Sequence, residues 1–198
     1  MAIGLAVVLL GAMALDTRVV TIGSEAGPVD DGFSAARFGP EQFPLVRASV
    51  EERAVEAGEL AAAIAEDPAA AGERYGVAAG IGPVIPLSFS GVVGKGQAGI
   101  YPVDVEGIPD ELTIRVQTGP AINGTDLRDA TGTIEFGQFT NQIEYQNAGA
   151  AINDEMKAQV LADIDTGELT GKTIAVTGVF KLINPHNWLV TPVRLDVQ

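Results

Sequence analysis

Apolar and polar positions alternate along three segments in the middle of the chain, as they do in half-buried β-strands. The alternation covers residues 89–93, 100–105 and 112–116, and Gly-rich or Pro-Asp turns separate the three segments. Two further segments rich in β-branched and apolar residues, 173–182 and 189–197, end the chain. Proline cannot donate a ladder hydrogen bond, so Pro192 predicts an edge position or a bulge in the last strand.

Between the third and fourth strand segments, the spacing of apolar residues changes from every second residue to the period of a helix. Ile152, Met156 and Val160 recur at steps of four within residues 148–165, while Asn153 falls on the polar side. We therefore expect a helix that packs on the strands through this apolar stripe and exposes Asn153 to water. Apolar residues within 134–139 predict a further short strand ahead of it.

An Ala-rich helical region precedes the strands. Apolar residues follow a 3.6 period over two stretches, 43–54 and 60–64. Asp67 and Pro68 supply a cap and a first residue for a second helix, which Gly76 ends. We expect a helical hairpin here that serves as scaffold.

Three strands, a helix and two more strands is the element order of an OB-type barrel. The sequence thus predicts an α+β fold: a five-stranded OB-like β-barrel with a helix after the third strand, preceded by an Ala-rich helical hairpin and an N-terminal apolar anchor. The expected divisions are a membrane anchor or signal segment (1–18), a linker (19–40), the helical hairpin (41–82) and the barrel domain (83–198). Such barrels bind several classes of ligand or none, so the fold leaves the function open.

The N-terminal segment from Ala2 to Leu15 carries no charge, and Asp16 and Arg18 mark its end. A spanning helix needs about 20 apolar residues, so this segment is about one turn short. Three interpretations follow: an anchor whose basic start lies upstream, a signal peptide cleaved after Ala14, or a buried N-terminal strand or helix. We expect the anchor, which would hold the protein on the periplasmic face of the cytoplasmic membrane.

The balance of charge limits the partners. Lysine and arginine number 12 against 26 acidic residues, and the formal net charge of −14 would repel phosphate backbones. We therefore expect no nucleic-acid partner. The absence of cysteine excludes a disulfide framework, a thiolate nucleophile and a cysteine-ligated zinc site. Nothing in the residue pattern indicates a cofactor.

Three short motifs have simpler explanations than chemistry. Residues 94–99 fit GxGxxG, but strand-like residues follow and cannot open a helix for a pyrophosphate, so we expect a hairpin turn. Asn123-Gly124-Thr125 fits both a glycosylation acceptor and a tight turn, and we expect the turn. His186, the single histidine, has no second histidine or cysteine to share a metal and is expected to be an exposed loop residue.

Hydrogen-bonding side chains are dense between residues 119 and 153. The candidate ligand-binding residues in this segment are Thr125, Arg128, Asp129, Asn141, Gln142, Glu144 and Tyr145. We expect Arg128 to form an ion-pair network with Asp129 and Glu144, and amides beside a tyrosine can grip hydroxyl-rich ligands. A structural role is the alternative, in which these groups cap the helix and tie the long connection to the barrel.

Four strings of residues carry a family resemblance. They follow an apolar N-terminal segment and an Ala-rich helical region in this order: Leu127-Arg128-Asp129, 139–145, Gly171-Lys172-Thr173 and 191–195. On these strings, and from about Asp16 to the end, the chain resembles a family of uncharacterised, predicted periplasmic lipoproteins. The resemblance implies export, membrane attachment, no established activity, and genes that lie beside sugar ABC transporter genes. Because no cysteine follows the apolar segment, an uncleaved apolar helix would have to replace an acyl anchor.

Three functions from different classes remain. The one we favour is a non-catalytic accessory module of a sugar ABC transport system, which binds a sugar or a transporter component through residues 125–153. The second is a structural or assembly factor of the envelope with no small ligand. The third is a carbohydrate hydrolase that uses two of Asp129, Glu135 and Glu144 as acid and base. No spacing singles out such a pair, so we expect no enzyme activity.

Overall fold

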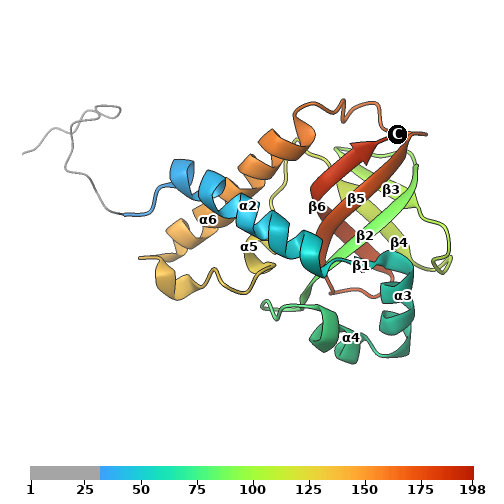
Figure 1. Cartoon of the computed structure of the whole chain (residues 1–198), viewed down its shortest axis with the longest axis horizontal. Helices are drawn as coiled ribbons and strands as arrows, with labels where there is room; N and C mark the ends of the chain where they lie inside the picture. The colour runs from blue at the N-terminus through green and yellow to red at the C-terminus, as the bar shows by residue number, and fades with distance from the viewer. Residues whose placement is uncertain (1–31) are drawn as a thin grey trace, which may run out of the picture. The chain divides into compact units, whose positions relative to one another are not determined.

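The alternating segments form the wall of a closed barrel in the computed structural model, which describes residues 32–198 (Figure 1). Its strands are β2 (Val84–Val93), β3 (Ile100–Asp104), β4 (Thr113–Gln117), β5 (Thr173–Lys181) and β6 (Asn187–Val197). The order around the barrel is β2-β3-β4-β6-β5, and pairing of β2 with β5 closes it. Only β4 and β6 run parallel among these neighbours. The α+β class and the five-stranded OB-like barrel are as predicted.

Strand β2 belongs to both halves of the barrel. Residues 84–92 pair with β5, and Val92 and Val93 at its end pair with β3. Glycine is needed at Gly91, because a Cβ there would collide with the Asp104 carbonyl of β3. The barrel interior holds Trp188 stacked on Phe180, with ring centroids 4.5 Å apart and both side chains fully buried.

The bulge predicted at Pro192 is confirmed. The register between β5 and β6 shifts at Thr177 and Gly178, where Gly178 faces Pro192. The shift lets β6 continue past a residue that has no amide hydrogen, although β6 has a paired neighbour on both sides.

Helix α2 (Ala35–Arg53) begins inside the segment expected to be a linker. Phe43, Val46 and Val50 are buried, as their spacing predicted. These side chains do not form a hairpin with the next helix. Instead α2 crosses α6 (Gln142–Met156), which begins about ninety residues after α2 ends (Figure 1). Only the glycine at position 39 allows this approach, since a Cβ would overlap the backbone of Ala151.

The predicted hairpin is therefore limited to α3 (Ala57–Glu66) and α4 (Pro68–Tyr75), which pack on each other. The Asp67 carboxylate accepts hydrogen bonds from the amides of residues 69 and 70 and caps α4, as expected. A two-residue strand, β1 (Val55–Glu56), joins α2 to α3 and runs parallel to β2.

Two expectations around α6 are wrong. Residues 134–139 form no strand but a 3₁₀ turn, Phe136–Gln138, at which Gln138 Oε1 accepts a hydrogen bond from the Glu135 amide at 3.3 Å. Asn153 is not exposed: its amide donates to the carbonyls of Ile122 (3.2 Å) and Gly124 (2.8 Å), which holds the connection after β4 against the helix. Ile152, Met156 and Val160 are buried as predicted. The helix begins at Gln142 and ends in a π-helical turn, Lys157–Leu161.

The expected membrane anchor (1–18) and the first part of the expected linker (19–31) lie outside the described residues. Within residues 32–198, none of the helices combines the length and the hydropathy needed to cross a bilayer.

Candidate functional site

The candidate residues nearest to the barrel lie on a one-turn helix, α5 (Asp126–Asp129), which packs against α6 and β5. Leu127 points into the core and is fully buried. This anchor directs Arg128 and Asp129 towards the start of α6 and the end of β5.

The Arg128 guanidinium is enclosed by partners. Its Nε and Nη2 donate to Asp129 Oδ1 at 2.8 and 2.7 Å, and Nη1 donates to the Tyr145 carbonyl at 3.1 Å. The guanidinium carbon lies 3.6 Å from the centroid of the Tyr145 ring, within cation–π distance. With the side chain only 8% exposed, Arg128 joins α5 to α6.

The Asp129 carboxylate connects this pair to β5. Its Oδ2 accepts a hydrogen bond from the Thr125 hydroxyl at 2.8 Å and lies 3.4 Å from Lys181 Nζ. Lys181 Nζ is also 3.3 Å from Asp126 Oδ1. We call these six residues the seam network: Thr125, Asp126, Arg128, Asp129, Tyr145 and Lys181.

The seam network balances its own charge, with two cations against two carboxylates. Burial raises the pKa of Asp126 above its ordinary value, and Lys181 only partly offsets that effect. Buried charges that pair in this way hold elements together, and an unpaired member would be costly.

The remaining candidates serve the N-terminus of α6. Asn141 Oδ1 accepts hydrogen bonds from the amides of Ile143 and Glu144, both at 3.0 Å. Glu144 Oε2 accepts from the Thr140 amide at 2.8 Å. The expected contact of Glu144 with Arg128 is therefore wrong, because capping this helix end occupies the carboxylate. Gln142 is exposed, and its side chain makes no hydrogen bond within the described part of the chain.

A groove of about 630 Å³ lies over the seam network, and we call it the polar groove. Arg128, Asp129 and Lys181 line its base. The loop of residues 78–81 and the turn of residues 134–136 line it as well. Phe136 is half-exposed in this turn, and its ring meets the Tyr145 ring edge-on at 5.6 Å.

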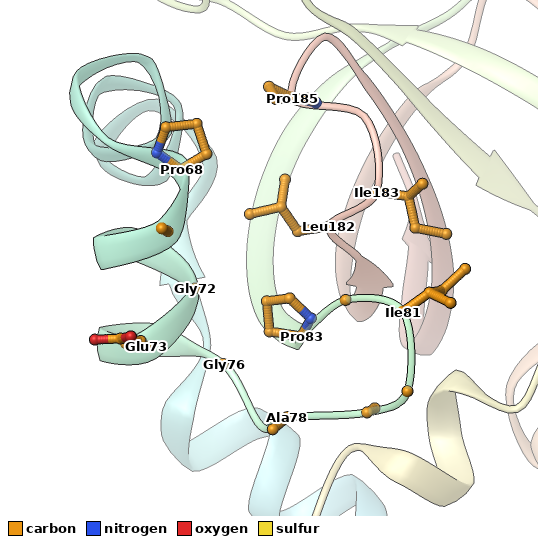
Figure 2. Close-up of a pocket in the computed structure, with 14 residues that line it drawn as sticks. Pro68, Gly72, Glu73, Gly76, Ala78, Ile81, Pro83, Leu182, Ile183 and Pro185 are labelled. Atoms are coloured by element: carbon orange, nitrogen blue, oxygen red, sulfur yellow. The ribbon is translucent and has the colours of Figure 1, made fainter.

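A second groove, about 670 Å³, lies on the other side of the same loop, and we call it the apolar groove. Figure 2 shows Pro83 and Leu182 between α4 and the turn that carries Ile183 and Pro185. Residues 78–81 line both grooves, so this loop is a shared wall.

Sequence reasoning missed Asp126, Lys181 and the loop of residues 78–81. Asp126 stands three residues before Asp129, a spacing that puts both carboxylates on one side of a helix, where a single cation can contact both. Lys181 ends a strand and carries no local signal for its position beside α5. The loop was taken only as the end of the helical hairpin.

The short motifs contain one surprise. Residues 94–99 form the turn between β2 and β3, and His186 is exposed on the loop before β6, both as expected. Asn123 and Gly124 form no tight turn. They lie in an irregular stretch because Asn153 holds the Gly124 carbonyl.

Comparison with known protein families shows to which family the chain belongs. The family described as "Predicted periplasmic lipoprotein (DUF2291)" matches residues 4–196. The chain belongs to this family. Membership indicates a periplasmic, membrane-associated location for the chain and, by its description, assigns no activity. No curated protein shows significant similarity to the sequence.

A solved structure supports the fold. An OB-fold protein from Thermotoga maritima superposes with a TM-score of 0.65 at 18% sequence identity. The match covers 85% of this family member and all of the other chain. At this identity the similarity establishes the fold alone.

Proposed function

We propose that this family member is a non-catalytic binding module, attached to the periplasmic face of the cytoplasmic membrane, that serves a sugar ABC transport system. The main support for this proposal is the polar groove, which we take as the binding site for a hydroxyl-rich ligand. The transport setting is what the family resemblance implies, and the uncharged N-terminal segment is the proposed attachment.

The groove offers the mixture of groups that small polar ligands use. Phe136 lines the groove with half of its surface exposed to solvent, and it can supply an apolar platform. Glu135 is exposed beside it, and Asp129 and Lys181 contribute polar atoms at the base. A volume of about 630 Å³ lies within the range of small-molecule sites.

The engagement of the carboxylates supports a non-catalytic role. A hydrolase needs two carboxyl groups that face the scissile bond, one as acid and one as base or nucleophile. Asp129 is held by Arg128, Thr125 and Lys181, while Glu144 caps α6. Glu135 is exposed at the start of the 3₁₀ turn, where its main-chain amide donates to Gln138 Oε1 at 3.3 Å. Two of the three carboxylates considered for catalysis thus have structural partners, which leaves Glu135 without a second free carboxylate among them to form an acid–base pair.

A thermal-shift screen against monosaccharides and sugar alcohols tests the proposal. A ligand at a hundredfold excess over its Kd stabilises the folded state by about 2.7 kcal/mol, which is easily measured as a rise in melting point. We expect one class of sugar to produce such a rise, and Phe136→Ala or Glu135→Gln to reduce it. Ile143→Ala is the matched control, because Ile143 is 68% exposed and does not line the groove. A shift that persists unchanged in both groove variants would exclude this site.

An envelope structural factor without a small ligand is the second candidate, and the completeness of the seam network favours it. Among residues 32–198, every buried side-chain nitrogen or oxygen has a hydrogen-bond partner. Arg128 therefore needs no ligand to satisfy it. If no sugar shifts the melting point while Arg128→Ala unfolds the domain readily, this second function takes precedence.

A further inference from the structure

We infer that the apolar groove receives an extended segment of a partner protein, in which an apolar side chain is accompanied by basic residues. The inference goes beyond the proposed sugar site, because it rests on a different groove and on different groups.

Large exposed apolar side chains lie close together in the apolar groove. Ile81 is 82% exposed and Ile183 is 61% exposed. Figure 2 shows both on the side of the groove opposite α4, with Pro83 and Leu182 between. Gathered apolar side chains at a concave surface mark sites where another molecule binds.

The loop of residues 78–81, which lines both grooves, favours a polypeptide as the molecule that binds in the apolar groove. The amides of residues 78–81 donate no hydrogen bond to any acceptor within the described chain. Gly80 has φ +62°, a left-handed conformation that suits glycine. Residues 79–82 form a turn, closed by the Gly82 amide donating to the Ala79 carbonyl at 3.4 Å, and its remaining amides lie beside exposed apolar side chains. Such amides can donate to the main-chain carbonyls of a bound peptide.

The charged residues that line the two grooves indicate which kind of peptide segment would bind. Glu73 lines the apolar groove, and Glu135 lines the polar groove on the far side of the shared loop. Both are exposed, and neither forms a salt bridge with another residue of the described part. Arg128 and Lys181 pair within the seam network, and Arg74 lies over the Tyr75 ring at 4.8 Å and lines neither groove. The charge that lines the two grooves without an ion-pair partner is therefore negative, and the chain as a whole carries −14, so a basic segment is complementary.

Selection from a random dodecapeptide phage library tests the inference. The full-length protein in detergent is the target, and the Ile81→Ser/Ile183→Ser variant is used for counter-selection. Both side chains are largely exposed, so we expect this variant to fold, with an unchanged melting point as the check. Leu45→Ser/Ile143→Ser is the matched control, because these residues are 61% and 68% exposed elsewhere on the surface.

We expect enriched peptides that combine a large apolar residue with lysine or arginine. Their affinity should fall about tenfold or more on the Ile81→Ser/Ile183→Ser variant and remain within about twofold on the control. Glu73→Gln/Glu135→Gln should weaken the same peptides and reduce the salt dependence of binding. Failure to enrich any sequence, enrichment of acidic peptides, or equal binding to the Ile81→Ser/Ile183→Ser variant would overturn the inference.

Discussion

Replacement of Arg128 by alanine separates a structural role of the seam network from a ligand-binding role. The guanidinium makes two hydrogen bonds to Asp129, one to the Tyr145 carbonyl and a close contact with the Tyr145 ring. Its side chain is 8% exposed and that of Asp129 is 12% exposed, so solvent screens this pair little.

The expected loss of stability depends on the partners that Asp129 retains after the substitution. Breaking a buried ion pair by removing one partner costs about 3–5 kcal/mol, because the other charge remains buried. Asp129 would retain Lys181 at 3.4 Å and the Thr125 hydroxyl, which reduces the loss. We expect Arg128→Ala to lower the free energy of unfolding by roughly 2–4 kcal/mol. For a domain of this size, each kcal/mol lowers the melting temperature by about 2–4 °C.

Urea unfolding followed by tryptophan fluorescence measures this loss. Trp188 is the only tryptophan, and it is fully buried against Phe180, so its emission reports the barrel core. Arg128→Lys keeps the charge but loses the bidentate pairing, and an intermediate loss is expected. A double-mutant cycle with Asp129→Asn isolates the coupling of the pair. An Arg128→Ala variant that loses less than about 0.5 kcal/mol would refute the structural role.

Three further predictions concern stability. Met156→Asp places a charge at a fully buried position and should cost roughly 3–5 kcal/mol in urea unfolding; a loss below about 0.5 kcal/mol would contradict the packing of α6. Asn153→Ala leaves the carbonyls of Ile122 and Gly124 without their donor and should cost about 1–3 kcal/mol, whereas a neutral result would mean that water replaces the amide. Because burial raises the pKa of Asp126 above 3.8, the folded state binds that proton more tightly than the unfolded chain does. Its contribution to stability should rise as pH falls through the folded pKa, and Asp126→Asn should remove this rise in melts between about pH 4 and 7; an identical pH profile for both proteins would show that Asp126 is not responsible.

The strands and the long helix were predictable because their signal is local. Alternation along β3 and the four-residue steps of Ile152 and Met156 reflect which side of each element meets the core. Capping by Asp67 was visible for the same reason, since cap and helix are neighbours in sequence.

The partners across the seam were less predictable because the chain brings them together from a distance. Arg128 and Asp129 are adjacent, and their pairing was foreseen. Lys181 approaches them only because β5 ends beside α5, which no local pattern encodes. Glu144 was predicted to join the ion-pair network, but its carboxylate accepts a hydrogen bond from the amide of Thr140, which lies four residues earlier in the sequence at the start of α6.

The burial of Asn153 illustrates the same limit. Its polar side chain falls on the water-facing side of the helical pattern, yet the connection after β4 crosses that side and supplies two carbonyls. The sequence periodicity describes a helix against one surface and takes no account of a loop that covers another.

Titration of the isotopically labelled full-length protein with a sugar from the thermal-shift screen, followed by ¹H–¹⁵N NMR, tests the central claim most directly. A ligand in the polar groove should shift the amide signals of Gly80, Ile81, Phe136 and Lys181 with one saturation curve, and leave Lys95 and Lys172, which lie beyond the opposite ends of β2 and β5, unchanged. Signals that stay fixed at millimolar sugar, or shifts confined to other surfaces, would contradict the account of this protein as a binding module that uses the polar groove.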